Sequence, residues 1–160
     1  MKKAGNIILI CVLIFLVGLF IHPKKVIYEP KIIGQVVDQN GNPIQNATVA
    51  RIEENEIKNK EFGYYEYKEF KSQIIKTDIN GNFVLTEKSK IDWFHTPLDL
   101  PFVWCYANFE VSKKGYESYK PEYNAEKNSK YNENLNACKG IEFKPKIILK
   151  SRVGKGELHP

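Results

Sequence analysis

Histidine is the side chain best suited to acid–base chemistry near neutral pH, and this 160-residue chain has three. They lie far apart, at His22, His95 and His159, and only His95 has carboxylates nearby, from Asp92 and Asp99. Such a pair can serve a hydrolase, but a lone loop histidine is far more often exposed or simply hydrogen-bonded. No nucleophile elbow and no H-E-x-x-H helix is present. The sequence therefore predicts no catalytic residues, no cofactor and no metal site, and a hydrolase built on His95 is the least favoured hypothesis.

Residues 34–49, GQVVDQNGNPIQNATV, contain glycines and an aspartate, so a phosphate-binding or calcium-binding loop has to be considered. Gly34 and Gly41 do not fit G-x-x-x-x-G-K-[ST], and no helix signal follows them. The segment DQNGN does not combine the calcium-loop pattern with a glutamate six residues after the glycine. Asn40 and Gly41 both tolerate positive φ, which favours a tight turn. We therefore expect a β-hairpin.

The three cysteines differ in their surroundings. Cys11 lies within an apolar run, whereas Cys105 and Cys138 lie in the later part of the chain, outside any C-x-x-C motif and away from histidines. A zinc site is therefore not expected. In an oxidising compartment Cys105 and Cys138 form a candidate disulfide, and two buried free thiols are the alternative. Sequence alone sets no Cα separation, so both possibilities stay open.

Residues 4–21 form an uncharged and almost entirely apolar run. As a helix this run would be about 27 Å long, close to the thickness of a bilayer core. The preceding Lys2 and Lys3 also suit a cleaved signal peptide, but the run ends without a small-residue cleavage site. We predict an uncleaved signal anchor over residues 1–25, a single membrane pass and a linker over residues 26–30. The short N-terminal tail and the later cysteine pair favour a domain on the extracytoplasmic, periplasmic side.

Short stretches rich in β-branched residues alternate with turn signals over residues 31–150, and none shows a sustained 3.6-residue period. Alternation within these stretches places a set of residues towards a common core: Val36, Val49, Ile75, Phe83 and Val111. Pro145 predicts an edge position or a bulge in the last stretch. The pattern predicts an all-β sandwich over residues 31–150, followed by a flexible tail over residues 151–160.

Three segments of this domain resemble the carboxypeptidase regulatory-like domain, which is a transthyretin-like (prealbumin-type) β-sandwich. They are GQVVDQNGNPIQNATV, KTDINGNFVL and FEVSKKGYESY. The positions that match the family pattern are Gly34, Val36, Asp38, Gly41, Pro43, Ile44, Ala47, Val49, Thr77, Asp78, Gly81, Phe83, Gly115 and Tyr116. The resemblance covers most of residues 31–119.

This resemblance implies an antiparallel, Greek-key-like sandwich of about seven strands. In that family the motif residues are structural: the glycines serve turns, Pro43 a strand entry, and Ala47, Val49 and Phe83 the core. The resemblance implies a module that binds, spaces or supports, closest to small, membrane-anchored stand-alone versions. This chain departs from the family by its long insertions and by having no attached peptidase domain, so the resemblance assigns no partner.

The insertion at residues 53–70 interleaves aromatic and charged residues. Its candidates for partner binding are Tyr64, Tyr65 and Tyr67, because tyrosine combines a large apolar ring with a polar tip. The favoured alternative is an extended hairpin whose aromatic side chains pack across its two strands.

The insertion at residues 90–104 is an apolar loop that contains Pro97 and Pro101. Its candidates for partner binding are Trp93, Phe94 and Trp104. The favoured alternative is a cap on the open end of the core, which would bury both tryptophans. A third interpretation is contact with a bilayer interface.

The charge of the chain bears on the class of partner. Its 24 basic and 19 acidic residues give a formal net charge of +5, but the lysines are scattered among glutamates and no nucleic-acid motif is present. Nucleic acid is therefore not an expected partner. The leading hypothesis is a non-enzymatic, membrane-anchored β-sandwich module in the cell envelope that binds a protein partner. The alternative is a periplasmic immunity or inhibitor protein that blocks a toxin with its aromatic loops.

Overall fold

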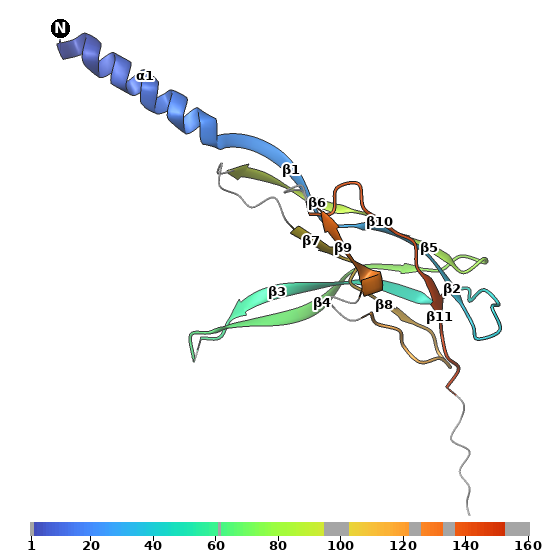
Figure 1. The fold of residues 1–160 in the computed structure, drawn as a ribbon. Coiled ribbons are helices and arrows are strands. Elements are labelled where there is room, and N and C mark those ends of the chain that lie inside the picture. The colour runs from blue at the N-terminus through green and yellow to red at the C-terminus, as the bar shows by residue number, and fades with distance from the viewer. Residues whose placement is uncertain (1, 61, 95–102, 122–125, 133–136, 153–160) are drawn as a thin grey trace, which may run out of the picture.

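The N-terminal end of the chain is helical, and the remaining elements are almost all β-strands (Figure 1). The computed structural model describes residues 2–60, 62–94, 103–121, 126–132 and 137–152. Helix α1 spans Lys2–Phe20. No helix among the described residues is both long and apolar enough to cross a membrane. The signal anchor over residues 1–25 stays a prediction.

A two-stranded antiparallel ribbon joins α1 to the rest of the domain (Figure 1). It consists of β1 (Ile21–Glu29) and β6 (Lys88–Phe94). The prediction of a linker over residues 26–30 is therefore wrong, because nearly all of these residues belong to β1. The prolines at either end of this stretch gave a local signal for irregular backbone, and pairing with a strand more than sixty residues away overrides that signal.

The first large sheet is built around β2 (Lys31–Val37). On one edge β2 pairs antiparallel with β5 (Asn82–Leu85). On the other edge it pairs in parallel with β10 (Glu142–Phe143) and then with β11 (Lys146–Ile148). Pro145 lies between these two short strands, as the predicted bulge or edge position requires. The parallel pairing corrects the expectation of a purely antiparallel sandwich.

The second large sheet is antiparallel and has the order β4-β3-β8. The strands β3 (Thr48–Lys58) and β4 (Tyr65–Lys76) form a long hairpin, and β8 (Phe109–Ser112) pairs with the inner end of β3. A separate antiparallel pair contains β7 (Val103–Tyr106) and β9 (Ser129–Asn132), the latter preceded by the 3₁₀-helix η1 (Glu126–Asn128).

The described residues contain eleven strands, whereas the sequence predicted about seven. The additional strands come from the β1–β6 ribbon, the β7–β9 pair and the division of the last strand into β10 and β11. The coarser prediction of an all-β domain with several antiparallel sheets is confirmed.

The core lies between the two large sheets and follows the alternation along their strands. Four of the five residues predicted to point inward are at most 3% exposed, namely Val36, Val49, Phe83 and Val111. Ile75 is partly buried and packs against the same cluster. The predicted register is therefore confirmed at these positions.

The two D-x-N-G-N segments form nearly identical turns. In each turn the aspartate Oδ1 accepts backbone N–H groups two and four residues later, at 2.8 Å for Asp38 and at 2.8–2.9 Å for Asp78. Gly81 adopts φ 73°, and a Cβ there would lie 2.3 Å from the carbonyl oxygen of Val36, so this close approach requires glycine. The two carboxylates therefore hold the turns together through hydrogen bonds to the backbone.

The hairpin expected over residues 34–49 is wrong in its pairing, although the turn is correct. A single bridge between Val37 and Pro43 closes the turn, and the chain then crosses from the sheet of β2 to the sheet of β3. The second turn likewise carries the chain from β4 to β5, in the other sheet. Thr77 joins the two crossings, because its Oγ1 donates to the carbonyl of Ile44 at 2.6 Å and accepts the N–H of Ala47 at 2.9 Å.

Replacing Phe83 with alanine should lower the free energy of unfolding by about 3–5 kcal/mol, because the buried ring lies against Gly34 and its removal leaves a cavity. The matched control is Val84→Ala on the solvent face of the same strand, where the side chain is 45% exposed. That change should cost less than about 0.5 kcal/mol. Denaturant unfolding of the oxidised chain measures both values, and equal losses would contradict the register.

Candidate functional site

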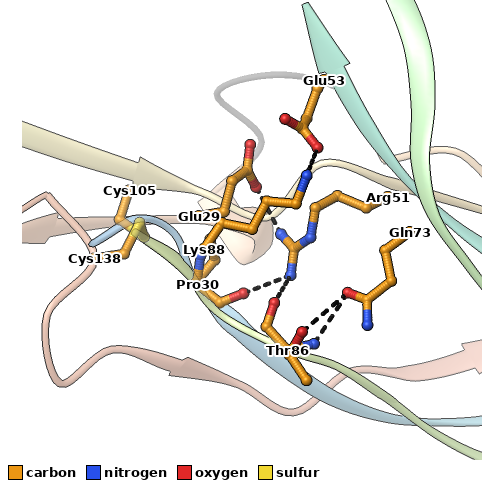
Figure 2. Close-up of polar contacts among 9 residues, drawn as sticks. All are labelled: Glu29, Pro30, Arg51, Glu53, Gln73, Thr86, Lys88, Cys105 and Cys138. Atoms are coloured by element: carbon orange, nitrogen blue, oxygen red, sulfur yellow. Dashed lines mark hydrogen bonds and ion pairs between the residues drawn. A yellow bond between two sulfur atoms is a disulfide. The ribbon is translucent and has the colours of Figure 1, made fainter. Parts of the chain in front are cut away.

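Arg51 on β3 is a charged side chain with no solvent exposure, which makes its surroundings a candidate chemical centre (Figure 2). Its Nη1 donates to a carboxylate oxygen of Glu29 at 2.6 Å. Its Nη2 donates to the backbone carbonyls of Pro30 and Thr86, each at 2.8 Å. The guanidinium is thus held by oxygens from the β1–β2 junction and from the residue after β5.

A second ion pair lies beside this one, between Lys88 and Glu53 (Figure 2). Burial raises the pKa of Glu29 despite the opposing charge of Arg51. Burial also acts to raise the pKa of Glu53, but the hydrogen bond and charge of Lys88, with the charge of Arg51, bring that pKa below its ordinary value. The two carboxyl groups are therefore shifted in opposite directions.

This ionic cluster is best explained as structural. Two carboxylates with separated pKa values can form an acid–base pair, but structural ion-pair networks shift pKa values as well. The Glu29 carboxylate faces the Arg51 guanidinium, whose nitrogens can only donate hydrogen bonds. No group of three or more histidine, cysteine or acidic side chains in the described part of the chain has the spacing to hold a metal ion. The cluster fastens the β1–β6 ribbon to the two sheets.

An aromatic surface on the β7–β9 pair is the stronger candidate for a binding site. Trp104 lies opposite Tyr131 in the register, and their rings meet edge to face at 5.6 Å. The ring of Tyr106, two residues further along β7, stacks near Trp104 at 6.5 Å. Trp104 is 54% exposed and Tyr131 is 45% exposed. We call Trp104, Tyr106 and Tyr131 the Trp104 cluster.

A disulfide lies directly behind this cluster. Cys105, between Trp104 and Tyr106, points to the opposite face of β7 and is 1% exposed. It is bonded to Cys138, with a Cα–Cα distance of 5.1 Å, which confirms the candidate pairing. Closing a loop of this size stabilises a fold by roughly 3–4 kcal/mol in the chain-entropy model. The disulfide therefore ties β7, the strand that carries Trp104 and Tyr106, to the turn that contains Cys138, and β9 is held to β7 by backbone pairing.

The core-cap interpretation of residues 90–104 is wrong. It required both tryptophans to be buried, but Trp93 is 52% exposed and Trp104 is 54% exposed. The ends of the expected loop are strands, since Trp93 belongs to β6 and Trp104 to β7. Pairing with β1 draws the first part of the segment into the ribbon and away from the core.

The structure describes only some of the other residues that the sequence singled out in this segment. Phe94 is the last residue of β6, where its backbone lies opposite Ile21, and its side chain lies outside the described parts of the structure. His95, Asp99, Pro97 and Pro101 also lie outside the described residues. Trp93 thus lies on the β1–β6 ribbon and Trp104 on the β7–β9 pair.

The tyrosines of the first insertion lie on the β3–β4 hairpin, as predicted, but do not pack across its strands as aromatic pairs. Tyr64, Tyr65 and Tyr67 are 51%, 56% and 69% exposed. Across the hairpin, Tyr65 lies opposite Lys58 and Tyr67 lies opposite Glu56. The extended hairpin is therefore confirmed, and the Lys58 ammonium lies over the Tyr65 ring at 5.9 Å, but no aromatic side chain faces these tyrosines from the opposite strand.

Comparisons with known proteins add little. No protein-family model matches the chain, and no curated protein matches it. Among solved structures, 3-chlorocatechol 1,2-dioxygenase from Rhodococcus opacus 1CP is similar with a TM-score of 0.37 and 16% sequence identity. The match covers 82% of this chain and 61% of the dioxygenase chain. A likeness this weak carries no argument about fold or activity.

The structural role of Arg51 has a pH-dependent consequence. Arg51→Met leaves the buried Glu29 carboxylate without its cation and should cost about 3–5 kcal/mol at neutral pH. A carboxyl group whose folded pKa is raised stabilises the fold fully below its unfolded pKa, and this contribution is lost as pH rises through the folded pKa. The loss should therefore be smaller near about pH 4, where Glu29 is largely protonated and needs no cation.

Urea unfolding at both pH values measures this difference. The matched control is Glu29→Gln in the Arg51→Met background, which removes the unpaired charge. It should recover much of the loss at neutral pH, because a neutral amide is easier to bury than a carboxylate. An equal loss for Arg51→Met at both pH values would show that Glu29 is not the group in question.

Proposed function

We propose that the chain is a non-enzymatic, membrane-anchored β-sandwich module of the cell envelope that binds a protein partner through the Trp104 cluster. The observation that carries the proposal is the exposure of Trp104 and Tyr131 on a strand pair in which β7 is tied to the rest of the fold by the Cys105–Cys138 disulfide. Contiguous exposed aromatic side chains on a rigid element commonly mark an interaction surface.

The arrangement favours binding because the aromatic side chains of the Trp104 cluster are already held in place before a partner binds. Tyr106 and Tyr131 contact the Trp104 ring from two directions, which restricts its rotation before any partner arrives. Binding then immobilises few side chains, so more of the contact energy appears as affinity. Tryptophan and tyrosine are also the residue types enriched among hot spots and at the centres of interfaces.

Two observations support the proposed location. A disulfide is typical of proteins that fold in oxidising compartments such as the periplasm. The uncharged run over residues 4–21, with basic residues before and after it, is typical of a signal anchor. The motifs shared with carboxypeptidase regulatory-like domains support membership of that group of non-catalytic modules, which we include in the proposal.

The anchor predicts that the full-length chain stays in the membrane pellet through washes with high salt and with alkaline carbonate. A charged residue in the middle of the run, as in Leu13→Arg, should release a substantial fraction, because arginine at the centre of a membrane helix costs about 2.5–3.5 kcal/mol on insertion scales. Immunoblotting of pellet and supernatant gives the fractions. A soluble mature form that begins near His22 would instead identify a cleaved signal peptide.

The Trp104 cluster predicts that Trp104→Ala weakens partner binding by about thirtyfold or more, equivalent to roughly 2 kcal/mol, while the melting temperature changes little. A tagged full-length chain captures the partner from solubilised envelope membranes, and the purified pair is then titrated. Val84→Ala, which trims an exposed residue on β5, is the control and should bind like the unmodified chain. Unchanged affinity of Trp104→Ala for the purified partner would remove this surface from the proposal.

A further inference from the structure

The outer edge of β4 is open to pairing over residues 65–71. Strand β4 ends the sheet order β4-β3-β8, so no described strand pairs with its outer side. Every side chain from residue 65 to residue 71 is exposed. We call this stretch the free edge.

The free edge is regular and has a defined inner limit. The register of the β3–β4 pair shifts between Ala50, opposite Ile74, and Ile52, opposite Lys71, so the extra residue lies on β4, just beyond the free edge. From Lys71 to the hairpin end the pairing runs without interruption. Beyond Lys71, Gln73 is engaged by the neighbouring sheet, since its side-chain oxygen accepts the N–H of Thr86. Long, regular edges without proline or a bulge are templates for another strand.

The sequence of the free edge complements itself. Two antiparallel strands related by a two-fold axis place residues of the same face opposite one another, so the pairing is centred on one residue. Centred on Tyr67, it places Glu66 opposite Lys68 of the second copy, and this pair occurs twice. It also places the two Tyr67 rings opposite each other. Centring on Lys68 or Glu69 would instead put two like charges face to face.

We propose that this edge binds a second copy of the chain and forms a continuous sheet across a two-fold axis centred on Tyr67. Opposite charges and aromatic rings in directly opposed positions stabilise antiparallel pairs, and main-chain hydrogen bonds complete the edge. Lys68 and Tyr67 are exposed, and Tyr67 is the most exposed tyrosine of the hairpin at 69%. The free edge shares no residue with the Trp104 cluster, so this proposal and the proposed partner binding fail independently.

Cysteine cross-linking of the full-length chain tests the register, with Cys11→Ser as background to remove the one free thiol among the described residues. Tyr67→Cys should form a disulfide-linked dimer under mild oxidation, because opposed Cα atoms about 4.5–5.5 Å apart suit a disulfide. Tyr65→Cys is the matched control on the same face, 56% exposed, and should cross-link at least about tenfold less, because its two copies are offset along the strands. Equal cross-linking of the two variants, or none for Tyr67→Cys, would overturn the proposal.

Charge reversal tests the same pairing by a second route. Lys68→Glu places glutamates opposite each other twice and should weaken the dimer by about tenfold, measured by sedimentation of the full chain in detergent. Adding Glu66→Lys should restore the dimer to within about threefold, because the opposed charges are again of opposite sign. Glu66→Lys alone is less informative, since Glu66 accepts a hydrogen bond from Asn59 within the hairpin. A single reversal without effect, or a double variant without rescue, would assign the edge to a strand of another protein or to solvent.

Discussion

The buried guanidinium of Arg51 is the constraint on which the arrangement of the domain depends. A buried charge needs hydrogen-bonding partners, and the two terminal nitrogens of Arg51 obtain theirs from Glu29, Pro30 and Thr86, whereas its Nε has no hydrogen-bond partner among the described residues. These residues lie where β1 passes into β2 and where β5 approaches β6, so one side chain holds both sheets and the root of the ribbon in register (Figure 2). A shift of any of these segments would leave the charge partly unpaired, which is why a buried ion pair specifies an arrangement even where it adds little net stability.

Two turns beside the core carry the chain from one large sheet to the other. They show that nearby residues determine the shape of a turn but not which sheet the next strand joins. Both D-x-N-G-N segments turn as their residues demand, since the aspartate caps the turn and the glycine takes a positive φ. Whether the chain then forms a hairpin or changes sheet depends on residues further along. Pro43 has no N–H to continue a ladder, and Asn46 takes a φ of 56° that redirects the backbone. The turns were therefore predictable from sequence, whereas the crossings were not.

Elsewhere too, features set by neighbouring residues were predicted from the sequence, whereas features that depend on distant residues were missed. Alternation identified the inward positions, but the partners of Arg51 lie 21 to 35 residues away and no local pattern names them. For the two tryptophans, which were also candidates for partner binding, burial in a core cap was the favoured interpretation because large aromatic side chains are usually buried. No residue near the tryptophans indicates the pairing of β1 with β6, which turned part of an expected loop into a ribbon.

The exposure of the Trp104 cluster follows from the disulfide once the strand is recognised. Side chains alternate along a strand, so a bond that fixes Cys105 inward places Trp104 and Tyr106 outward. A one-residue slip of β7 would bury the rings but would also turn Cys105 away from Cys138. The covalent bond therefore opposes the burial that the hydrophobic effect would otherwise favour for these rings. An aromatic surface held out of the core in this way differs from an apolar side chain left exposed for lack of space, and this difference supports the proposal that the Trp104 cluster binds a partner.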